Sequence, residues 1–348
     1  MGRRTALVVG ARGVVGSNLI DYLATDAQWE VIGLSRRGGT GRPRSRHVAV
    51  DLLDAAATRA IAPELADVTH VFYAAYQERP SWSELIAPNV SMLANVLDAV
   101  EGAASLQHVS LMQGYKVYGA HLGPFKTPAR EDDPPHMPPE FNVDQQRLLE
   151  DRQRDAGWTW SAIRPSVVCG TALGNPMNLA MVIAVYASIA RELRVPLRFP
   201  GKPGAYTSLL EMTDAGLLAA ATVWAATEPR CANQAFNIAN GDLFRWAEMW
   251  PRIAGMFELD LAPPQPMSLV DVMADKRTAW QRLKERHGLR PAYEEVSSWA
   301  FGDFVFSWDY DMFADTSKSR RFGFHDYVDT FAMFERTFEV LRRDRIIP

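Results

Sequence analysis

The sequence predicts an α/β protein in which a Rossmann-type, doubly wound parallel sheet precedes a smaller, mostly helical C-terminal region. Three observations predict this fold class. The apolar run TALVVG (5–10) is followed by the glycine-rich turn GARGVVG (10–16) and by helical spacing in SNLIDYLATDA (17–27). Further strand-like and helix-like stretches then alternate as far as residue 170. The length of 348 residues also favours two structural units.

The first turn has the spacing G-x-x-G-x-x-G between an expected strand and an expected helix. Gly10 permits the tight turn, Gly13 lets the backbone approach a pyrophosphate, and Gly16 lets helix and strand pack closely. The alternative is a tight turn that binds nothing, but the flanking strand and helix favour dinucleotide binding at the helix N-terminus. The ligands expected from this turn are Gly10, Arg12, Gly13, Val14, Val15 and Gly16.

A second strand is expected in WEVIGLSRRGG (29–39), which contains Ser35, Arg36 and Arg37 near its end. A protein selective for NAD carries an acidic residue here for the ribose 2′-hydroxyl, whereas guanidinium groups suit a 2′-phosphate. We therefore expect these three residues to bind the cofactor, and we expect the cofactor to be NADP.

The next two expected strands also end in candidate cofactor ligands. VAVDLLD (48–54) ends a third strand with Asp51 and Leu52, where the carboxylate could meet the adenine amino group while the leucine packs on the ring. A solvated turn is the alternative for this pair. THVFYAAY (69–76) reads as a fourth strand, in which Ala74 and Ala75 are small enough for the backbone to run beside the cofactor.

The rest of the first half continues the alternation of helix and strand. Helices are expected in 82–100 and 141–157, and strands in 106–119, with a loop at its end, and in 158–170. Ligands of open α/β sheets bind beyond the carboxyl ends of the strands. By position, the candidates are Ser110, Gln113, Tyr115, Lys116, Tyr118, Pro165, Ser166 and Val167.

Several longer motifs follow one another along nearly the whole chain. They are GARGVVG, LSRRG, HVFYAAY, LQHVSLMQGYKVYG, WSAIRPSVVCG, PMNLAMVIAVYASIARE, PLRFPG and NQAFNIANGDLFRW. With these motifs the chain resembles an extended short-chain dehydrogenase/reductase, and more narrowly the progesterone 5β-reductase and iridoid synthase family of enone reductases. The resemblance implies an NADP-binding Rossmann domain in 1–170 and a substrate-binding region in 171–348, parts of which return to the Rossmann core.

The catalytic pair of such enzymes is altered in this chain. The wider superfamily uses a tyrosine as proton donor and a lysine that lowers its pKa. In the reductase family the lysine lies upstream, where Lys116 matches it, and the tyrosine heads a helix, where FNVDQQR places Asn142 or, in a second alignment, Phe141. An asparagine amide can donate a hydrogen bond but cannot serve as a general acid. Tyr115, Tyr118 or solvent could then supply the proton.

The C-terminal half suits a largely apolar carbonyl substrate. Met, Phe, Trp and aliphatic residues are frequent in 176–201, 208–229 and 299–308. We expect NADPH-dependent reduction of an α,β-unsaturated carbonyl compound, with hydride moving to the β-carbon and Lys116 stabilising the enolate. Two alternatives stay open: non-redox enolate chemistry by an isomerase, cyclase or lyase with structural NADP, and a non-catalytic NADP sensor. Ordinary nucleotide-sugar epimerase or dehydratase chemistry is disfavoured.

Composition excludes several other classes of function. A net charge of -4 gives no reason to expect a nucleic-acid partner, and no apolar run reaches the roughly 20 residues of a membrane span. Two cysteines, Cys169 and Cys231, are too few for a disulfide framework or a zinc site, which suits a cytoplasmic protein. The seven histidines show no ligand pair at helical spacing, so no metal is expected. A homodimer is the assembly considered.

Overall fold

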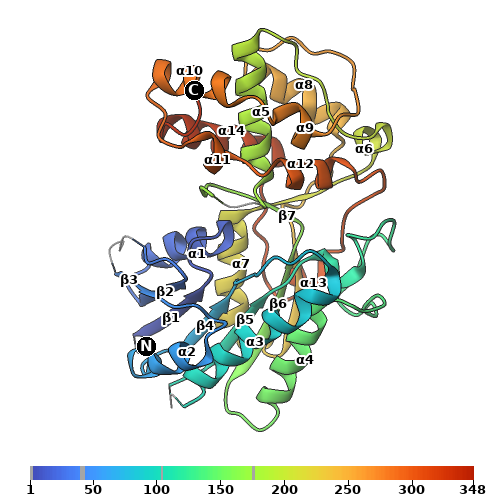
Figure 1. Cartoon of the computed structure of the whole chain (residues 1–348). Coiled ribbons are helices and arrows are strands. Elements are labelled where there is room, and N and C mark those ends of the chain that lie inside the picture. Colours follow the sequence, from blue (N-terminus) through green and yellow to red (C-terminus); the bar gives the residue numbers. More distant parts are fainter. Residues whose placement is uncertain (1–2, 40–43, 103–104, 175–176) are drawn as a thin grey trace. The chain divides into compact units, whose positions relative to one another are not determined.

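The central element of the structure is a seven-stranded sheet with the strand order β3-β2-β1-β4-β5-β6-β9 (Figure 1). Every neighbouring pair in it is parallel. The computed structural model describes residues 3–39, 44–102, 105–174 and 177–348. The strands are β1 (Arg4–Val9), β2 (Trp29–Ser35), β3 (Ser45–Ala49), β4 (His70–Tyr73), β5 (His108–Met112), β6 (Thr159–Pro165) and β9 (Gln234–Ile238).

The chain folds into two compact units. Unit 1 contains residues 1–165, 215–238 and 315–325, and unit 2 contains residues 166–214, 239–314 and 326–348. The helices of unit 1 are α1 (Val14–Ala24), α2 (Ala55–Ala60), η1 (Ala62–Leu65), α3 (Trp82–Val100), η2 (Tyr115–Tyr118), α4 (Phe141–Gln153), α7 (Ala215–Thr227), η3 (Pro229–Cys231) and α13 (Ser317–Arg321).

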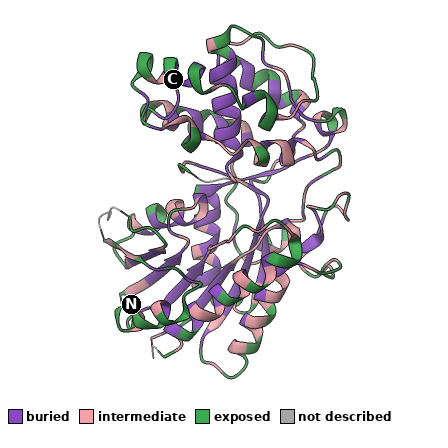
Figure 2. Cartoon of the chain, in the orientation of Figure 1, coloured by how far each residue is buried: buried purple, intermediate pink, exposed green. Residues whose placement is uncertain are grey.

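Alternation along the strands of unit 1 builds a hydrophobic core on each face of the sheet. Leu7 and Val9 of β1 belong to one core, which α3 and α4 cover, while Ala6 and Val8 belong to the other, which α1 and α7 cover. Parallel strands that are buried on both faces read as continuous apolar runs, as TALVVG does. Most of the sheet is accordingly purple in Figure 2, whereas the helices of unit 1 carry pink and green stretches as well.

Most elements of unit 1 form where the sequence predicts them, and the predicted fold class is confirmed. Helix α3 begins after Ser81, whose hydroxyl accepts a hydrogen bond from the Glu84 N–H at 3.4 Å, and it spans the predicted 82–100. Helix α1 begins at Val14, three residues before the predicted 17–27, because Gly13 is its N-cap. The predicted strand 158–170 is interrupted at Ser166, where β6 ends and β7 (Val167–Cys169) begins.

Unit 2 is mostly helical. A two-stranded parallel sheet of β7 and β8 (Met212–Asp214) accompanies its helices. These are α5 (Leu179–Leu193), α6 (Pro203–Thr207), α8 (Trp246–Met256), α9 (Leu269–Met273), α10 (Arg277–His287), α11 (Tyr293–Val296), α12 (Trp299–Phe306) and α14 (Thr330–Arg343). Pro176, the first residue of the PMNL motif, lies outside the described residues.

The large aromatic residues of unit 2 form its core. Phe199, Trp246, Trp250 and Phe306 are all less than 2% exposed, and their ring centroids lie 5.3–6.0 Å apart. These residues contribute packing energy, and aromatic pairs in such edge-to-face arrangements add to it. No helix in the described part of the chain is long and apolar enough to cross a membrane.

Candidate active site

The glycine-rich turn joins the end of β1 to the start of α1. Gly10 has a positive φ of 85°, and a Cβ there would lie 2.6 Å from the Ala74 carbonyl oxygen after β4. A Cβ at Gly16 would overlap the Gly10 carbonyl, so neither position accepts a side chain. The first N–H groups of α1, including those of Val14 and Val15, have no partner within the helix, because no helical carbonyl group precedes them by four residues. This turn can therefore bind a phosphate.

Three predicted arginines lie near the end of β2. The Arg12 guanidinium donates to the carbonyl oxygen of Gly38 at 2.8 Å, which brings it to the loop that carries Arg36 and Arg37. All three arginines are exposed, and the Ser35 hydroxyl donates to the Arg37 carbonyl oxygen. Arg12 of the turn and the two arginines of the loop thus form a group of three cations that could meet a second phosphate.

The remaining residues predicted to bind the cofactor differ in their accessibility. Asp51 is exposed, and its carboxylate accepts from the Leu53 N–H at 3.1 Å, whereas Leu52 is buried in the core. Ala74 and Ala75 are half-buried just after β4. Ser110 lies within β5, only 2% exposed, and accepts from the Ser161 hydroxyl at 3.2 Å. The structure therefore does not bring Ser110 together with the other candidates.

The segment after β6 crosses from one unit to the other. Pro165 ends β6 in unit 1, and Ser166 and Val167 belong to unit 2. The Ser166 hydroxyl donates to the Glu211 carbonyl oxygen at 2.8 Å, and its N–H donates to the Thr213 hydroxyl at 3.0 Å. The polar groups of Ser166 are thus engaged within unit 2.

Lys116 lies in η2, beyond the carboxyl end of β5, and faces two aromatic rings. Its ammonium nitrogen is 5.0 Å from the ring centroid of Trp82 and 5.8 Å from that of Tyr76. Burial lowers the pKa of Lys116, while the carboxylates of Glu140 and Glu78 act in the opposite direction. A partly desolvated cation next to aromatic faces is suited to stabilise negative charge on a bound ligand.

Asn142 is buried at the start of α4, and its amide already has a partner. Its Nδ2 donates to Oε1 of Glu140 at 2.5 Å, and its N–H donates to the same oxygen at 3.0 Å. Glu140 is thus the N-cap of α4, and it is only 5% exposed. The Asn142 carbonyl oxygen accepts from Gln113 at 2.8 Å, which connects β5 with α4. The position expected for a catalytic phenol therefore contains a carboxylate–amide pair.

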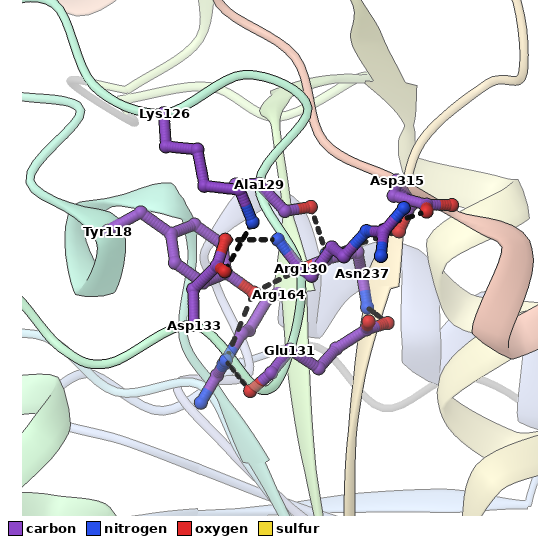
Figure 3. A network of polar contacts seen from close by, with 9 residues as sticks. All are labelled: Tyr118, Lys126, Ala129, Arg130, Glu131, Asp133, Arg164, Asn237 and Asp315. Carbon is purple, nitrogen blue, oxygen red and sulfur yellow. Dashed lines mark hydrogen bonds and ion pairs between the residues drawn. The ribbon is translucent and has the colours of Figure 1, made fainter.

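Tyr118 is part of a buried hydrogen-bond network that also contains Arg164 and Asn237 (Figure 3). Its hydroxyl donates to Asn237 Oδ1 at 2.6 Å and accepts from Arg164 at 3.0 Å. Burial raises its pKa to about 12, although Arg164 acts in the opposite direction. Tyr115 is 3% exposed, with its ring 5.9 Å from that of Tyr118. Both rings therefore pack in unit 1, and the Tyr118 phenol holds its proton strongly.

The same network anchors the loop between η2 and α4. The Glu131 carboxylate accepts from the Asn237 N–H at 2.8 Å, and Arg164 donates to the Glu131 carbonyl oxygen at 3.2 Å. Lys126 pairs with Asp133, as Figure 3 shows. The chain from residue 126 to residue 133 is thereby tied to β6 and β9.

Sequence reasoning missed five residues around Lys116: Tyr76, Trp82, His121, His136 and Glu140. The Tyr76 hydroxyl donates to Glu78 at 2.8 Å, and burial raises its pKa. His121 packs edge-on against Trp82 with ring centroids 4.5 Å apart. Burial, Lys116 and His136 lower the pKa of His121 to about 4, so its imidazole is neutral at pH 7. Only Glu140 offered a local signal, as an acidic residue directly before a predicted helix.

Comparisons with known proteins show the family to which this chain belongs. The sequence model of a family described as a PRISE-like Rossmann-fold domain matches residues 46–348. An (S)-8-oxocitronellyl enol synthase, CYC2 of Camptotheca acuminata, is 32% identical over 99% of this chain and 93% of its own length. The ISY2 enzyme of Nepeta racemosa, with the same activity in its name, is 34% identical over 99% of this chain and 91% of its own length. The short chain dehydrogenase gsfE of Penicillium aethiopicum is 32% identical over 99% of both chains.

Solved structures share the fold at lower sequence identity. The UDP-glucose 4-epimerase of Thermotoga maritima, solved with UDP-glucose, has a TM-score of 0.71 at 16% identity and covers 97% of this chain and 99% of its own. A Thermus thermophilus UDP-glucose 4-epimerase in complex with NAD has a TM-score of 0.68 at 18% identity, and the match covers 97% of this chain and 99% of the epimerase. These similarities establish the extended Rossmann-type fold.

Proposed function

Since this chain belongs to the PRISE-like Rossmann-fold family and is an enzyme of the short-chain dehydrogenase/reductase type, we propose that it uses NADPH to reduce an apolar α,β-unsaturated carbonyl compound. The observation that carries the proposal is the position of Lys116, a partly buried cation beyond β5 that faces Tyr76 and Trp82 and lies near Glu140.

The glycine-rich turn and the arginines support NADP as the cofactor. A side chain at Gly10 or Gly16 would fill the turn, and the first N–H groups of α1 suit the pyrophosphate. Arg12, Arg36 and Arg37 suit the additional 2′-phosphate of NADP, because guanidinium groups bind phosphate oxygens in pairs. When bound, NADPH supplies the hydride for the reaction.

Lys116 would stabilise the charge that the reaction creates. Addition of hydride to the β-carbon moves the electron pair of the carbon–carbon double bond toward the carbonyl, and negative charge develops on its oxygen. An ammonium group with little surrounding water stabilises such an oxyanion strongly. The two aromatic rings help to exclude water from Lys116 and hold its charge in one place.

The fate of the enolate is the step in which this chain departs from its superfamily. Asn142 and Glu140 stand where a phenol is expected, and the Tyr118 phenol is engaged with Asn237 and Arg164. We therefore propose that the enzyme forms the enolate and that solvent protonates it, on oxygen to give the enol or on carbon to give the saturated carbonyl. The names of two of the relatives, which describe an enol synthase, support this order of events.

The test is oxidation of NADPH, followed by its near-ultraviolet absorbance, with a panel of cyclic and acyclic enones and enals. Lys116→Ala should lower kcat at least about 100-fold, the cost of one oxyanion stabiliser. Lys202→Ala, a change at an exposed lysine of unit 2, is the matched control and should retain full activity. Asn142→Tyr, which places a phenol at the position expected for the proton donor, should raise kcat. Equal turnover by wild type and Lys116→Ala would disprove the role of Lys116.

A non-redox reaction on the same fold is the second candidate. The observation that favours it is Glu140, a buried carboxylate near Lys116 that could move a proton next to an enolate. Conversion of a carbonyl substrate with no net change in NADPH would support this candidate. Tight NADP binding with no conversion across the panel would favour a sensor.

A further inference from the structure

Two histidines and a glutamate from separate parts of the η2–α4 connection meet in unit 1. His121 follows η2, His136 lies in the following loop, and Glu140 caps α4. Each residue offers one ligand atom, and these atoms all lie within 4.8 Å of one another. The two imidazole rings are 5.2 Å apart at an angle of 65°, and His121 Nε2 is 3.9 Å from Glu140 Oε2.

The imidazoles in this cluster lack the hydrogen bonds that buried polar groups normally have. The side chains of His121 and Glu140 are 1% and 3% exposed. All four ring nitrogens of His121 and His136 are buried, and none hydrogen-bonds to a group in the described residues. A buried nitrogen without a hydrogen bond destabilises the fold, so several in one place require an explanation.

Glu140 has one oxygen available to complete a ligand set. Its Oε1 accepts both hydrogen bonds from Asn142, whereas Oε2 accepts none within the described part of the chain and lies 3.9 Å from Nε2 of His121. Hydrogen bonds from a neighbouring residue to a carboxylate, such as those from Asn142, orient a carboxylate that coordinates a metal. The loop before His136 is anchored through Glu131 and Asp133, so the histidine is presented by a fixed segment.

The geometry points to a divalent-metal site of the zinc class in which His121, His136 and Glu140 are the three protein ligands. Two imidazoles and one carboxyl group form a ligand set that Zn²⁺ accepts, and three protein ligands leave a fourth position for water or a substrate oxygen. Bond lengths of about 2.0–2.1 Å in a tetrahedral site require ligand atoms about 3.3 Å apart, so the most distant pair would approach by up to about 1.5 Å on binding.

Lys116 is the group that opposes a cation at this site. It interacts electrostatically with both His121 and Glu140. A positive charge near the ligands weakens metal binding, so Lys116→Met should tighten it, whereas exchange of an exposed lysine should not. Loss of a ligand should weaken metal binding, whereas loss of the Lys116 charge should strengthen it. Loose binding to surface histidines would not show these two opposite effects.

The experiment is a titration of the full chain, freed of metal by a chelator, with Zn²⁺ against a chromophoric chelator and with Co²⁺ followed by its visible spectrum. We expect one ion per chain and the spectrum of a tetrahedral or five-coordinate site with nitrogen and oxygen ligands. His136→Gln and Glu140→Gln should each weaken binding at least about tenfold. His325→Gln, a change at an exposed histidine of unit 1, should leave it unchanged.

Glu140→Gln retains an oxygen for the hydrogen bonds from Asn142, so this variant tests the ligand without removing the helix cap. Circular dichroism and thermal unfolding confirm that each variant is folded. Wild-type protein that binds no ion, or that binds it as tightly as His136→Gln, would overturn the inference. No measurement requires turnover, so failure of the proposed reduction would not affect this result.

Discussion

The side-chain amide of Asn142 donates to Oε1 of Glu140 at 2.5 Å, and both residues are 5% exposed. One oxygen of Glu140 therefore fixes the asparagine side chain and the first turn of α4 together. The second oxygen lies 3.9 Å from Nε2 of His121, and the carboxylate also interacts electrostatically with Lys116, so polar groups gather at the start of this helix.

Asn142→Asp should destabilise the protein in a pH-dependent way. Two buried carboxylates this close cannot both ionise, so the folded state raises the pKa of one of them. A raised pKa contributes stability at low pH that is lost as pH rises, so the deficit should grow between about pH 4 and pH 8, to about 2–3 kcal/mol. Urea unfolding at several pH values measures it. Addition of Glu140→Gln to this variant should remove the pH dependence, and a constant deficit would contradict the pairing.

The activity of the enzyme should fall at alkaline pH because Lys116 loses its proton. Burial lowers the pKa of this ammonium group from the ordinary 10.5, so the alkaline limb of kcat should lie below that value. Lys116→Arg should move the limb to higher pH, because a guanidinium remains charged. A pH profile of NADPH oxidation measures both. If the alkaline fall of kcat lies at the same pH in Lys116→Arg, a group other than Lys116 causes it.

Gly16→Ala should lower both stability and cofactor affinity. The added methyl group would overlap the Gly10 carbonyl, and the backbone shift should cost about 1–3 kcal/mol. Gly255→Ala is the control, because a Cβ there meets nothing within 4 Å and the residue lies inside α8; it should stabilise the protein by up to about 1 kcal/mol. Thermal unfolding with and without NADP compares the two variants. Equal changes in stability would contradict the close approach of Gly16 to the Gly10 carbonyl.

Replacement of Arg36 and Arg37 by serine should change the cofactor preference. Loss of two guanidinium groups should weaken NADP binding about 10- to 100-fold and leave NAD binding nearly unchanged, since NAD lacks the 2′-phosphate. Arg154→Ser, a change at an exposed arginine of unit 1, should affect neither. Fluorescence titrations with both reduced cofactors measure the ratio. Parallel losses for the two cofactors would indicate a structural role instead.

Tyr118→Phe should affect stability far more than catalysis. The change leaves buried Asn237 Oδ1 without its donor and should cost about 1–3 kcal/mol. The rate of NADPH oxidation by folded protein should stay within about threefold of wild type, because the hydroxyl is occupied by Asn237 and Arg164. If kcat falls 100-fold while the unfolding free energy is unchanged, Tyr118 is the proton donor.

The sequence by itself determined the elements that rest on local patterns. Helix α3 was predicted at both ends, because the spacing of its apolar residues is a local signal. The glycine-rich turn was predicted as a unit, because Gly10 and Gly16 serve a conformation and a close approach within a short stretch of chain. Lys116 and Asn142 were singled out by resemblance of their surrounding motifs.

Only the tertiary structure decided which side chains meet. Helix α7, which lies in a stretch predicted to line the substrate region, packs on α1 in unit 1, because its apolar surface completes the core under the sheet. Tyr76, Trp82, His121 and His136 gather near Lys116 because parallel strands bring their carboxyl ends to one edge of the sheet. Such contacts depend on the path of the chain between the elements, for which spacing along the sequence gives no signal.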